Sequence, residues 1–87
     1  MFTEVLMPKG SPDMETGVII KWEKKEGAAV EKAEEIANVE TDKAVVVVEA
    51  PCSGILNILA QEGEEVPVGN VIGAIYDSKD EYEKSLR

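Results

Sequence analysis

Histidine is absent from this chain of 87 residues, and cysteine occurs once, as Cys52. The lack of histidine excludes a Ser-His-Asp triad and a Cys-His nucleophile pair. A single cysteine also excludes an internal disulfide bond and a zinc site of the Cys/His type. Gly69 and Gly73 lack the spacing of a phosphate-binding loop. We therefore expect no catalytic residue and no metal site, and we expect Cys52 to be a half-buried thiol in a turn.

Basic residues and long apolar runs are scarce as well. The chain has 9 Lys and Arg against 18 Asp and Glu, which gives a formal net charge of −9. Such a charge repels phosphate backbones and anionic lipids, so neither nucleic acid nor a membrane is expected as a partner. It favours either a basic protein partner or simple solubility. No apolar run approaches the roughly 20 residues of a membrane span and no signal peptide is evident, so we expect a cytoplasmic location, or the mitochondrial matrix or plastid of a eukaryote.

Short apolar runs separated by glycine and proline predict an all-β domain. Apolar residues make up 44% of the chain and aromatic residues only 5%, so the core must be built from valine, isoleucine and leucine. The expected strands are Phe2–Met7, Gly17–Trp22, Ile36–Val39, Val45–Val48, Gly54–Leu59 and Val71–Tyr76, with very short ones around Val30 and Val66. The Val45–Val48 strand is expected to be buried, Trp22 to pack in the core, and Gly27 to adopt a positive φ angle.

The chain contains an internal repeat. Residues 17–40 resemble residues 54–76, with an offset of 37 residues before the Gly27/Gly63 turn and 36 after it. The six matched positions are Gly17 and Gly54, Gly27 and Gly63, Val30 and Val66, Ala33 and Gly69, Ile36 and Ile72, and Val39 and Ile75. Each copy reads as strand, turn, short strand, turn and strand, and neither can bury an apolar face alone. The repeat predicts a flattened barrel or sandwich whose halves are related by a pseudo-two-fold axis.

The two copies end differently. At the same offset Lys43 corresponds to Lys79, but only Lys43 is followed at once by another strand. We expect residues 1–77 to form one domain and residues 78–87 to begin a charged, flexible linker. Ser78 and Glu81 have the spacing of a capping box, yet a helix this short frays without packing, so a linker is favoured. A pseudo-two-fold axis would place the Lys43 turn and the C-terminal end at opposite ends of the domain.

A presented lysine is the remaining feature that can carry chemistry. Apolar runs flank Thr41-Asp42, where a short aspartate side chain can bond its own backbone two residues on. This pattern predicts a β-hairpin with Asp42 and Lys43 at its tip. A lysine amine is mostly protonated at neutral pH and is a poor nucleophile by itself. Lys43 is therefore either an ordinary solvated lysine or an attachment point that a separate ligase acylates.

The hairpin sequence resembles that of a known family. Glu40-Thr41-Asp42-Lys43-Ala44 is similar to the lipoyl-attachment motif of lipoyl domains in the dihydrolipoyl acyltransferase component of 2-oxo acid dehydrogenase complexes. Met7-Pro8-x-x-Ser11-Pro12-x-Met14-x-x-Gly17 resembles the opening of those domains, and Lys24-Lys25-Glu26-Gly27 resembles their next turn. The resemblance covers Phe2 to about Asp77. It implies a flattened β-barrel of two four-stranded antiparallel sheets, in agreement with the repeat.

By this resemblance Lys43 is amidated by lipoic acid, and Glu40, Thr41, Asp42 and Ala44 shape the turn that is recognised. The lipoyl arm would carry acyl groups and reducing equivalents between active sites, so the domain is a carrier and not an enzyme by itself. The implied partners are a lipoate ligase or lipoyl transferase, a thiamine-diphosphate-dependent 2-oxo acid decarboxylase, the acyltransferase core and dihydrolipoamide dehydrogenase. The Met-Pro and Ser-Pro opening favours a pyruvate dehydrogenase complex.

In the family, the loop after the first strand lies beside the lipoyl turn and helps partner recognition. The residues of that loop here are Lys9, Gly10, Ser11, Pro12, Asp13, Met14 and Glu15. Family members usually have Leu where Gly10 stands, Thr where Asp13 stands and Gly where Ala33 stands. The first two differences bear on which decarboxylase is recognised.

Two other functions stay open. A biotinyl carrier domain shares the fold, but biotin domains typically place Met on both sides of the lysine, where this chain has Asp42 and Ala44. An unmodified adaptor domain of the same barrel type is the second alternative, and the intact Asp-Lys hairpin argues against it.

Overall fold

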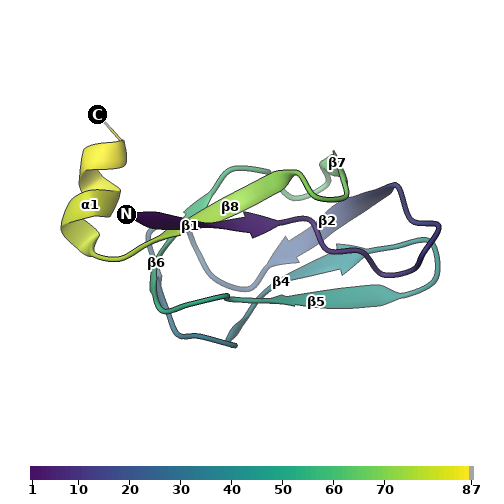
Figure 1. The fold of residues 1–87 in the computed structure, drawn as a ribbon, viewed down its shortest axis with the longest axis horizontal. Helices are drawn as coiled ribbons and strands as arrows, with labels where there is room; N and C mark the ends of the chain where they lie inside the picture. Colours follow the sequence, from purple (N-terminus) through teal and green to yellow (C-terminus); the bar gives the residue numbers. More distant parts are fainter. Residues whose placement is uncertain (87) are drawn as a thin grey trace.

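Eight strands form two four-stranded antiparallel sheets in the computed structural model, which describes residues 1–86 (Figure 1). The elements are β1 (Phe2–Leu6), β2 (Thr16–Trp22), β3 (Ala29–Val30), β4 (Glu35–Glu40), β5 (Val45–Glu49), β6 (Gly54–Ile58), β7 (Glu65–Pro67), β8 (Val71–Tyr76) and α1 (Lys79–Ser85). One sheet has the order β1-β8-β6-β3 and the other the order β5-β4-β2-β7. The two sheets stack as a flattened sandwich and do not close into a continuous barrel. All eight strands expected from the sequence are present.

The pseudo-two-fold repeat is confirmed by the strand pairing. The short strand of each half pairs with a long strand of the other half, β3 with β6 and β7 with β2. Val30 pairs with Gly54, and the equivalent residues Val66 and Gly17 also pair. The turns show the same exchange. The Gly27 N–H donates to the Leu56 carbonyl at 2.8 Å, and the Gly63 N–H donates to the Ile19 carbonyl at 2.6 Å. Neither half completes its backbone hydrogen bonds without the other, which explains why the two fold as one unit.

The core between the sheets is almost entirely aliphatic. Its largest fully buried side chains are those of Met7, Ile19, Ile36, Val39, Leu56, Ile72 and Ile75. Trp22 is 8% exposed, and its indole N–H donates to the Ala60 carbonyl at 2.9 Å. The expected core position of Trp22 is thus confirmed, with the polar edge of the ring satisfied. Cys52 is half-buried, as expected.

The expectation that Val45–Val48 is a buried strand is wrong. Strand β5 lies at the edge of its sheet, with only β4 beside it. Its side chains alternate, so that Val45 and Val47 are 57% and 41% exposed while Val48 is 6% exposed. Four consecutive valines indicate a strand by their shape, but they do not say whether that strand lies at the centre or the edge of a sheet.

A second difference concerns the C-terminal end, where a helix forms in place of the expected linker. Ser78 caps α1, and its hydroxyl accepts a hydrogen bond from the Glu81 N–H at 3.2 Å, as the capping-box spacing suggested. Tyr82 anchors the helix by donating its hydroxyl to the Glu26 carboxylate at 2.6 Å, and its ring meets Tyr76 edge-on at 6.1 Å. This packing supplies the stability that a two-turn helix lacks in isolation. The domain boundary after Asp77 stays a prediction.

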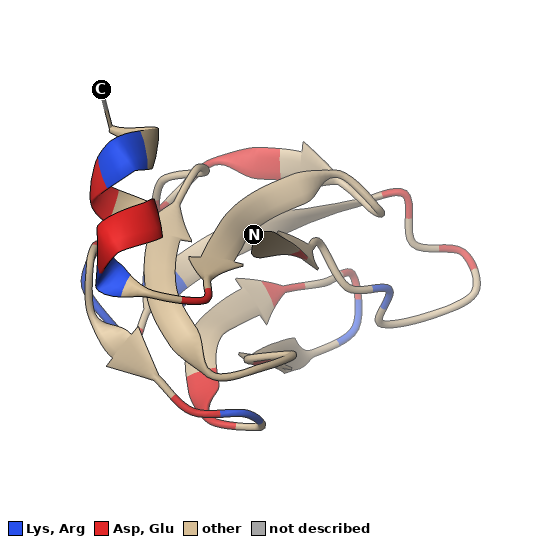
Figure 2. Cartoon of the chain, turned by 60° about the vertical axis from the view of Figure 1, so that its left-hand side comes forward, with Lys and Arg blue, Asp and Glu red and all other residues tan. Residues whose placement is uncertain are grey.

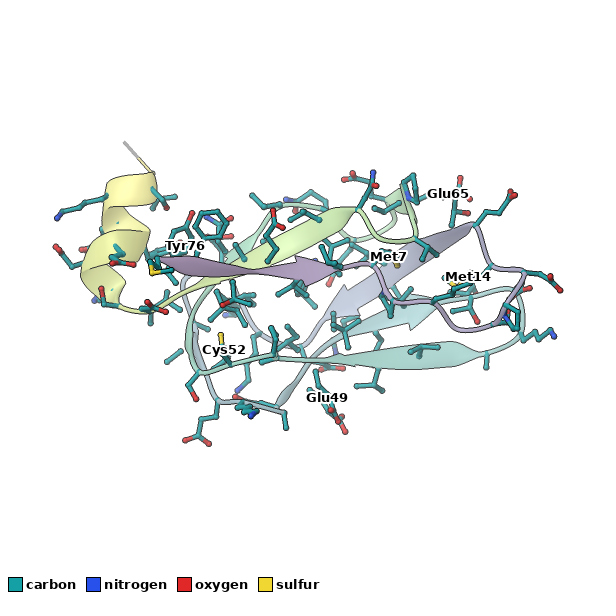
Figure 3. The ribbon with its side chains drawn as sticks, viewed as in Figure 1. Met7, Met14, Glu49, Cys52, Glu65 and Tyr76 are labelled. Atoms are coloured by element: carbon teal, nitrogen blue, oxygen red, sulfur yellow. The ribbon has the colours of Figure 1, made fainter. Side chains whose placement is uncertain are left out.

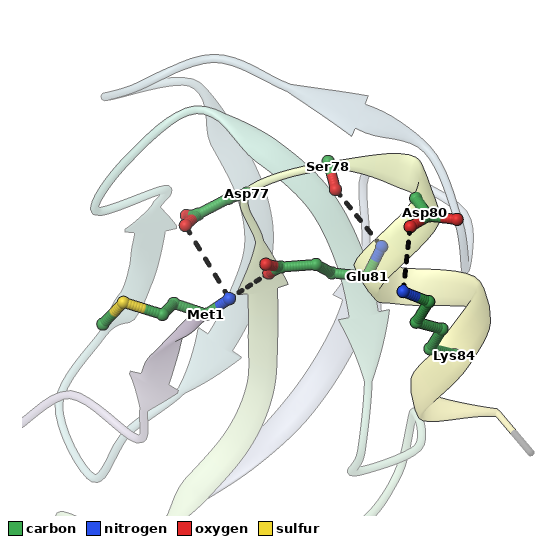
Figure 4. Close-up of polar contacts among 6 residues, drawn as sticks. All are labelled: Met1, Asp77, Ser78, Asp80, Glu81 and Lys84. Atoms are coloured by element: carbon green, nitrogen blue, oxygen red, sulfur yellow. Dashed lines mark hydrogen bonds and ion pairs between the residues drawn. The ribbon is translucent and has the colours of Figure 1, made fainter.

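Polar contacts hold the start of α1 against the N-terminus (Figure 4). The Asp77 carboxylate lies 3.9 Å from the amino group of Met1, which also contacts Glu81. An Asp80–Lys84 ion pair at 3.2 Å runs along the helix.

Among residues 1–86 there is no helix with the length and apolar character needed to span a membrane.

The β4–β5 turn and α1 lie at opposite ends of the molecule (Figure 1), as the pseudo-two-fold axis predicted. The longest dimension of the structure is 39 Å, against 24 and 18 Å in the other two directions. A chain that continues beyond α1 therefore leaves from the end far from Lys43.

Candidate functional site

Lys43 lies in the four-residue turn Thr41–Ala44 that joins β4 to β5. Glu40 and Val45 are the last paired residues of the two strands, so the hairpin closes immediately before and after the turn. Lys43 is exposed, and it makes no ion pair within the described part of the chain. The expected position of Lys43 at the hairpin tip is confirmed. Its side chain is held out by two strands that are themselves anchored in the sandwich.

The Thr41 side chain organises this turn. Its hydroxyl donates to the Ala44 carbonyl at 2.6 Å and accepts from the N–H groups of Lys43 and Ala44 at 3.3 and 3.1 Å. The Thr41 N–H also donates to the Ala44 carbonyl at 2.9 Å. We expected Asp42 to make such local bonds, but Thr41 makes them, because a hydroxyl can both donate and accept whereas a carboxylate only accepts. The backbone of Lys43 is thereby tied to one neighbouring side chain.

The loop between β1 and β2 lies against this turn. The Ser11 hydroxyl donates to the Asp42 carboxylate at 3.2 Å, so Asp42 bonds to the loop instead of its own turn. Gly10 approaches still more closely: a Cβ atom placed on it would lie 2.8 Å from the Thr41 methyl group and 3.2 Å from a Val46 methyl group. The structure therefore brings the predicted recognition loop and the predicted attachment turn together, although they are separated by about thirty residues in the chain.

Met14 holds the loop from the core side. Its side chain is 5% exposed, and its sulfur accepts the Gly10 N–H at 3.0 Å. Together with Met7 it fills the space between the sheets toward the β4–β5 turn (Figure 3). A Cβ atom on Gly17 would lie 2.8 Å from atoms of both methionines, so this glycine makes room for them. Met14 thus sets the position of the loop and does not belong to its exposed surface.

The other loop residues are available at the surface. Lys9, Gly10, Pro12, Asp13 and Glu15 are exposed, and Ser11 is half-exposed. Glu40 and Ala44, at either side of the turn, are exposed as well. Acidic segments are spread over α1, β7 and the loops at both ends of the molecule instead of forming one charged face (Figure 2). The lysine end is distinguished by shape and by the loop contact more than by charge.

Two features of this site were not predicted from the sequence: the three hydrogen bonds of the Thr41 hydroxyl and the close approach of Val46 to the loop. Thr41 was expected to help shape the turn, and its threefold hydrogen bonding could have been suspected from a threonine next to an Asp-Lys pair. The Val46 contact with the loop could not have been suspected, because it depends on how the loop crosses the end of the sandwich. Lys79, the repeat counterpart of Lys43, is the first residue of α1 and lies in no closed turn.

Known proteins resemble this chain over most of its length. A family model described as "Biotin-requiring enzyme" matches residues 3–75. The mitochondrial pyruvate dehydrogenase protein X component of Mus musculus is 40% identical over 83 residues, which cover 93% of this chain. The dihydrolipoyllysine-residue succinyltransferase component of the 2-oxoglutarate dehydrogenase complex of Buchnera aphidicola is 40% identical, with 86% of this chain covered. The corresponding acetyltransferase component of the acetoin cleaving system of Bacillus subtilis is 41% identical, with 92% covered.

The fold has a solved counterpart as well. The solution structure of the lipoyl domain of the 2-oxoglutarate dehydrogenase complex from Azotobacter vinelandii matches with a TM-score of 0.67 at 30% identity, covering 85% of this chain and 98% of that domain. By contrast, the matched parts make up only 17%, 19% and 20% of the three relatives above. The chain spans about a fifth of the length of these curated relatives, so the likeness concerns one domain of each.

Proposed function

The chain belongs to the family of biotin- and lipoyl-attachment domains, and on that basis we propose that Lys43 carries lipoic acid in amide linkage and that the domain works as a carrier. The observation that supports this most directly is the exposed Lys43 in a turn that Thr41 ties together. Lipoic acid is favoured over biotin because the relatives are dihydrolipoyllysine-bearing components and the structural counterpart is a lipoyl domain. Asp42 and Ala44 beside the lysine favour it as well.

The residues present suit such an attachment. An amide requires a primary amine that a ligase can reach, and Lys43 is exposed without an ion pair among residues 1–86. When bound, lipoic acid supplies a dithiolane that accepts electrons and an acyl group. The protein positions the arm: β4 and β5 hold the backbone on either side of Lys43, and the Thr41 hydrogen bonds fix the conformation of the turn. Amide formation also removes the positive charge of the lysine.

The exposed loop and the turn together form the surface proposed for partner recognition. The Ser11–Asp42 hydrogen bond joins them, so an enzyme that takes in the Lys43 arm meets the loop at the same time. In a 2-oxo acid dehydrogenase complex those enzymes are a thiamine-diphosphate decarboxylase, an acyltransferase core and dihydrolipoamide dehydrogenase. Tethering the arm near all three raises its effective concentration at each active site. We propose pyruvate as the 2-oxo acid, in line with the Met-Pro and Ser-Pro opening of the chain.

Attachment is tested by intact mass after expression with a lipoate ligase and, separately, with a biotin ligase. We expect a lipoyl adduct on the wild type and on Lys79→Ala, and none on Lys43→Ala. Lys43→Ala should fold normally, with an unfolding free energy within about 0.5 kcal/mol of the wild type, because the side chain is exposed. A biotin adduct would favour a biotinyl carrier, and the absence of any adduct with either ligase would favour an unmodified adaptor domain.

The choice of complex is tested by reductive acylation of the lipoylated domain. Purified decarboxylases for pyruvate, 2-oxoglutarate, branched-chain 2-oxo acids and acetoin are compared at equal concentration. We expect the highest kcat/KM with the pyruvate enzyme. A higher value with any of the others would overturn the assignment to pyruvate while leaving the carrier function in place.

A further inference from the structure

Gly10 contacts the residue that holds the Lys43 backbone. We propose that Gly10 is a positioning residue for Lys43: the absence of a side chain at this position lets the loop close onto Thr41, which in turn holds the turn that presents the lysine. Gly10 touches neither the amine nor any reacting atom. The functional meaning of this inference rests on the proposed carrier role of Lys43, but the physical coupling can be measured without it.

Thr41 cannot readily move away from position 10. Its methyl group lies 2.8 Å from where a Cβ atom of residue 10 would be, which is closer than carbon atoms approach in proteins. Because threonine is branched at Cβ, any rotation that moves the methyl group also swings the hydroxyl. That hydroxyl bonds the Ala44 carbonyl at 2.6 Å and the Ala44 N–H at 3.1 Å, so a rotation would break the bonds that define the turn.

The loop cannot readily move away either, since it is fastened on both sides of the contact. The Gly10 N–H donates to the sulfur of Met14, whose side chain is buried in the core. The Met14 N–H donates to the Ser11 carbonyl at 3.2 Å, and the Ser11 hydroxyl holds Asp42. A side chain at position 10 must therefore rotate Thr41 or lift the loop, and either change alters residues next to Lys43. The contact is tight because both partners are held independently.

The test is a double-mutant cycle that removes the Thr41 methyl group while keeping its hydroxyl. Gly10→Ala should shift the backbone amide NMR signals of Lys43 and Ala44 and lower kcat/KM for lipoate attachment by about tenfold, because a small misplacement of a reacting group is costly. Thr41→Ser alone keeps the hydroxyl that bonds Ala44, and its own amide positions and rate are the baseline against which the double variant is read. In the Thr41→Ser background, Gly10→Ala should cause a smaller amide shift and a smaller loss of rate than in the wild type, because the nearest methyl group is gone while the Val46 methyl group at 3.2 Å remains.

A general loss of stability must be separated from this effect. Gly63 is the matched control, because it has a φ angle of +87° and no neighbour within 4 Å of an added Cβ atom. Gly63→Ala should lower the melting temperature without shifting the Lys43 and Ala44 amides, and Thr41→Ser should not rescue it. The inference is overturned if Gly10→Ala leaves the amides and the rate unchanged, or if the double variant is no better than Gly10→Ala. If the wild type itself accepts no lipoate, the carrier proposal fails while the amide shifts still decide the coupling.

Discussion

The two halves of the molecule share one scaffold but continue into different segments. In both, two long strands pair and the short strand crosses to the other half. After the first half, a four-residue turn returns the chain as β5 at the sheet edge, and Lys43 is left in that turn. After the second half, the chain continues into α1, where Lys79 is an ordinary first-turn residue. The presentation of Lys43 is therefore due to the returning strand and not to the repeated unit.

The glycine turns within the two halves have the same backbone conformation but different surroundings. Gly27 and Gly63 have φ angles of +83° and +87°, so the positive φ expected for Gly27 is confirmed. A Cβ atom on Gly27 would meet the Tyr82 hydroxyl at 3.2 Å, whereas one on Gly63 would meet nothing within 4 Å. Helix α1 thus covers one turn of the pair and leaves its equivalent open. Substitutions at equivalent positions separate what the repeat requires from what its surroundings add.

The largest expected losses of stability are those of Gly27→Val and Gly63→Val. A β-branched residue in the left-handed region costs about 1–3 kcal/mol at either site. Gly27→Val should lose about 1 kcal/mol more, because it also displaces Tyr82 from its hydrogen bond with Glu26. Urea unfolding followed by Trp22 fluorescence measures both variants. Equal losses would show that the Tyr82 contact contributes nothing, and an unchanged Gly27→Val would contradict the turn geometry itself.

A smaller effect is expected from the helix contact alone. The hydrogen bond to Glu26, with lesser contributions from burial and from the Glu26 charge, raises the pKa of Tyr82 from 10.0 to about 12. The folded state therefore holds this proton more tightly than the unfolded state, so the contribution is fully present below pH 10 and is lost as the pH rises from 10 to about 12. Tyr82→Phe should cost about 1 kcal/mol at pH 8 and should remove this part of the alkaline decline.

Thermal unfolding between pH 8 and pH 11 tests the Tyr82 prediction, with Tyr76→Phe as the matched control. That variant removes only the Tyr76 hydroxyl. It keeps the ring that packs against Phe2 and Tyr82, and it leaves the Tyr82–Glu26 bond in place. It should retain the full alkaline decline. If Tyr82→Phe and the wild type have identical pH profiles, the Tyr82–Glu26 contact is not the cause of the alkaline loss of stability.

The smallest expected effect, and one of opposite sign in the two halves, concerns Ala33 and Gly69. Ala33 has a φ angle of +71° where the equivalent Gly69 has +89°. Backbone bonds impose this conformation: the Ala33 N–H donates to the Ala50 carbonyl at 2.8 Å, and the Gly69 N–H donates to the Met7 carbonyl at 3.1 Å. A left-handed alanine costs about 1–2 kcal/mol, and glycine costs about 0.5–1 kcal/mol through the entropy of the unfolded chain.

Ala33→Gly should therefore stabilise the domain by up to about 1 kcal/mol, and Gly69→Ala should destabilise it by a similar amount. Differential scanning calorimetry at one protein concentration measures both changes. A loss of stability in Ala33→Gly would mean that the Ala33 side chain makes a contact that outweighs its strain, and the equivalence of the two turns would fail at this point.

Much of what the two halves share could be predicted from the sequence. The eight strands, the hairpin around Lys43 and the positive φ of Gly27 result from local chemistry, because β-branched runs, turn residues and glycine report on the backbone at their own positions. The repeat was visible because six equivalent residues recur in the same order. It predicted that the two halves pack on each other and that Lys43 and the C-terminal end lie at opposite ends, since two units that bury one common face are related by an axis between them.

Only the tertiary structure decided the features that depend on a neighbour distant in the chain. Val45 and Val47 of β5 are exposed because they lie on the face of their sheet that points away from the other sheet, and α1 is held by Tyr82, which bonds Glu26, a residue far away in the sequence. The close approach of Gly10 to Thr41 belongs to the same class. A residue's own chemistry selects its backbone conformation, but burial and contact are set by which surfaces meet, and local sequence does not encode that meeting.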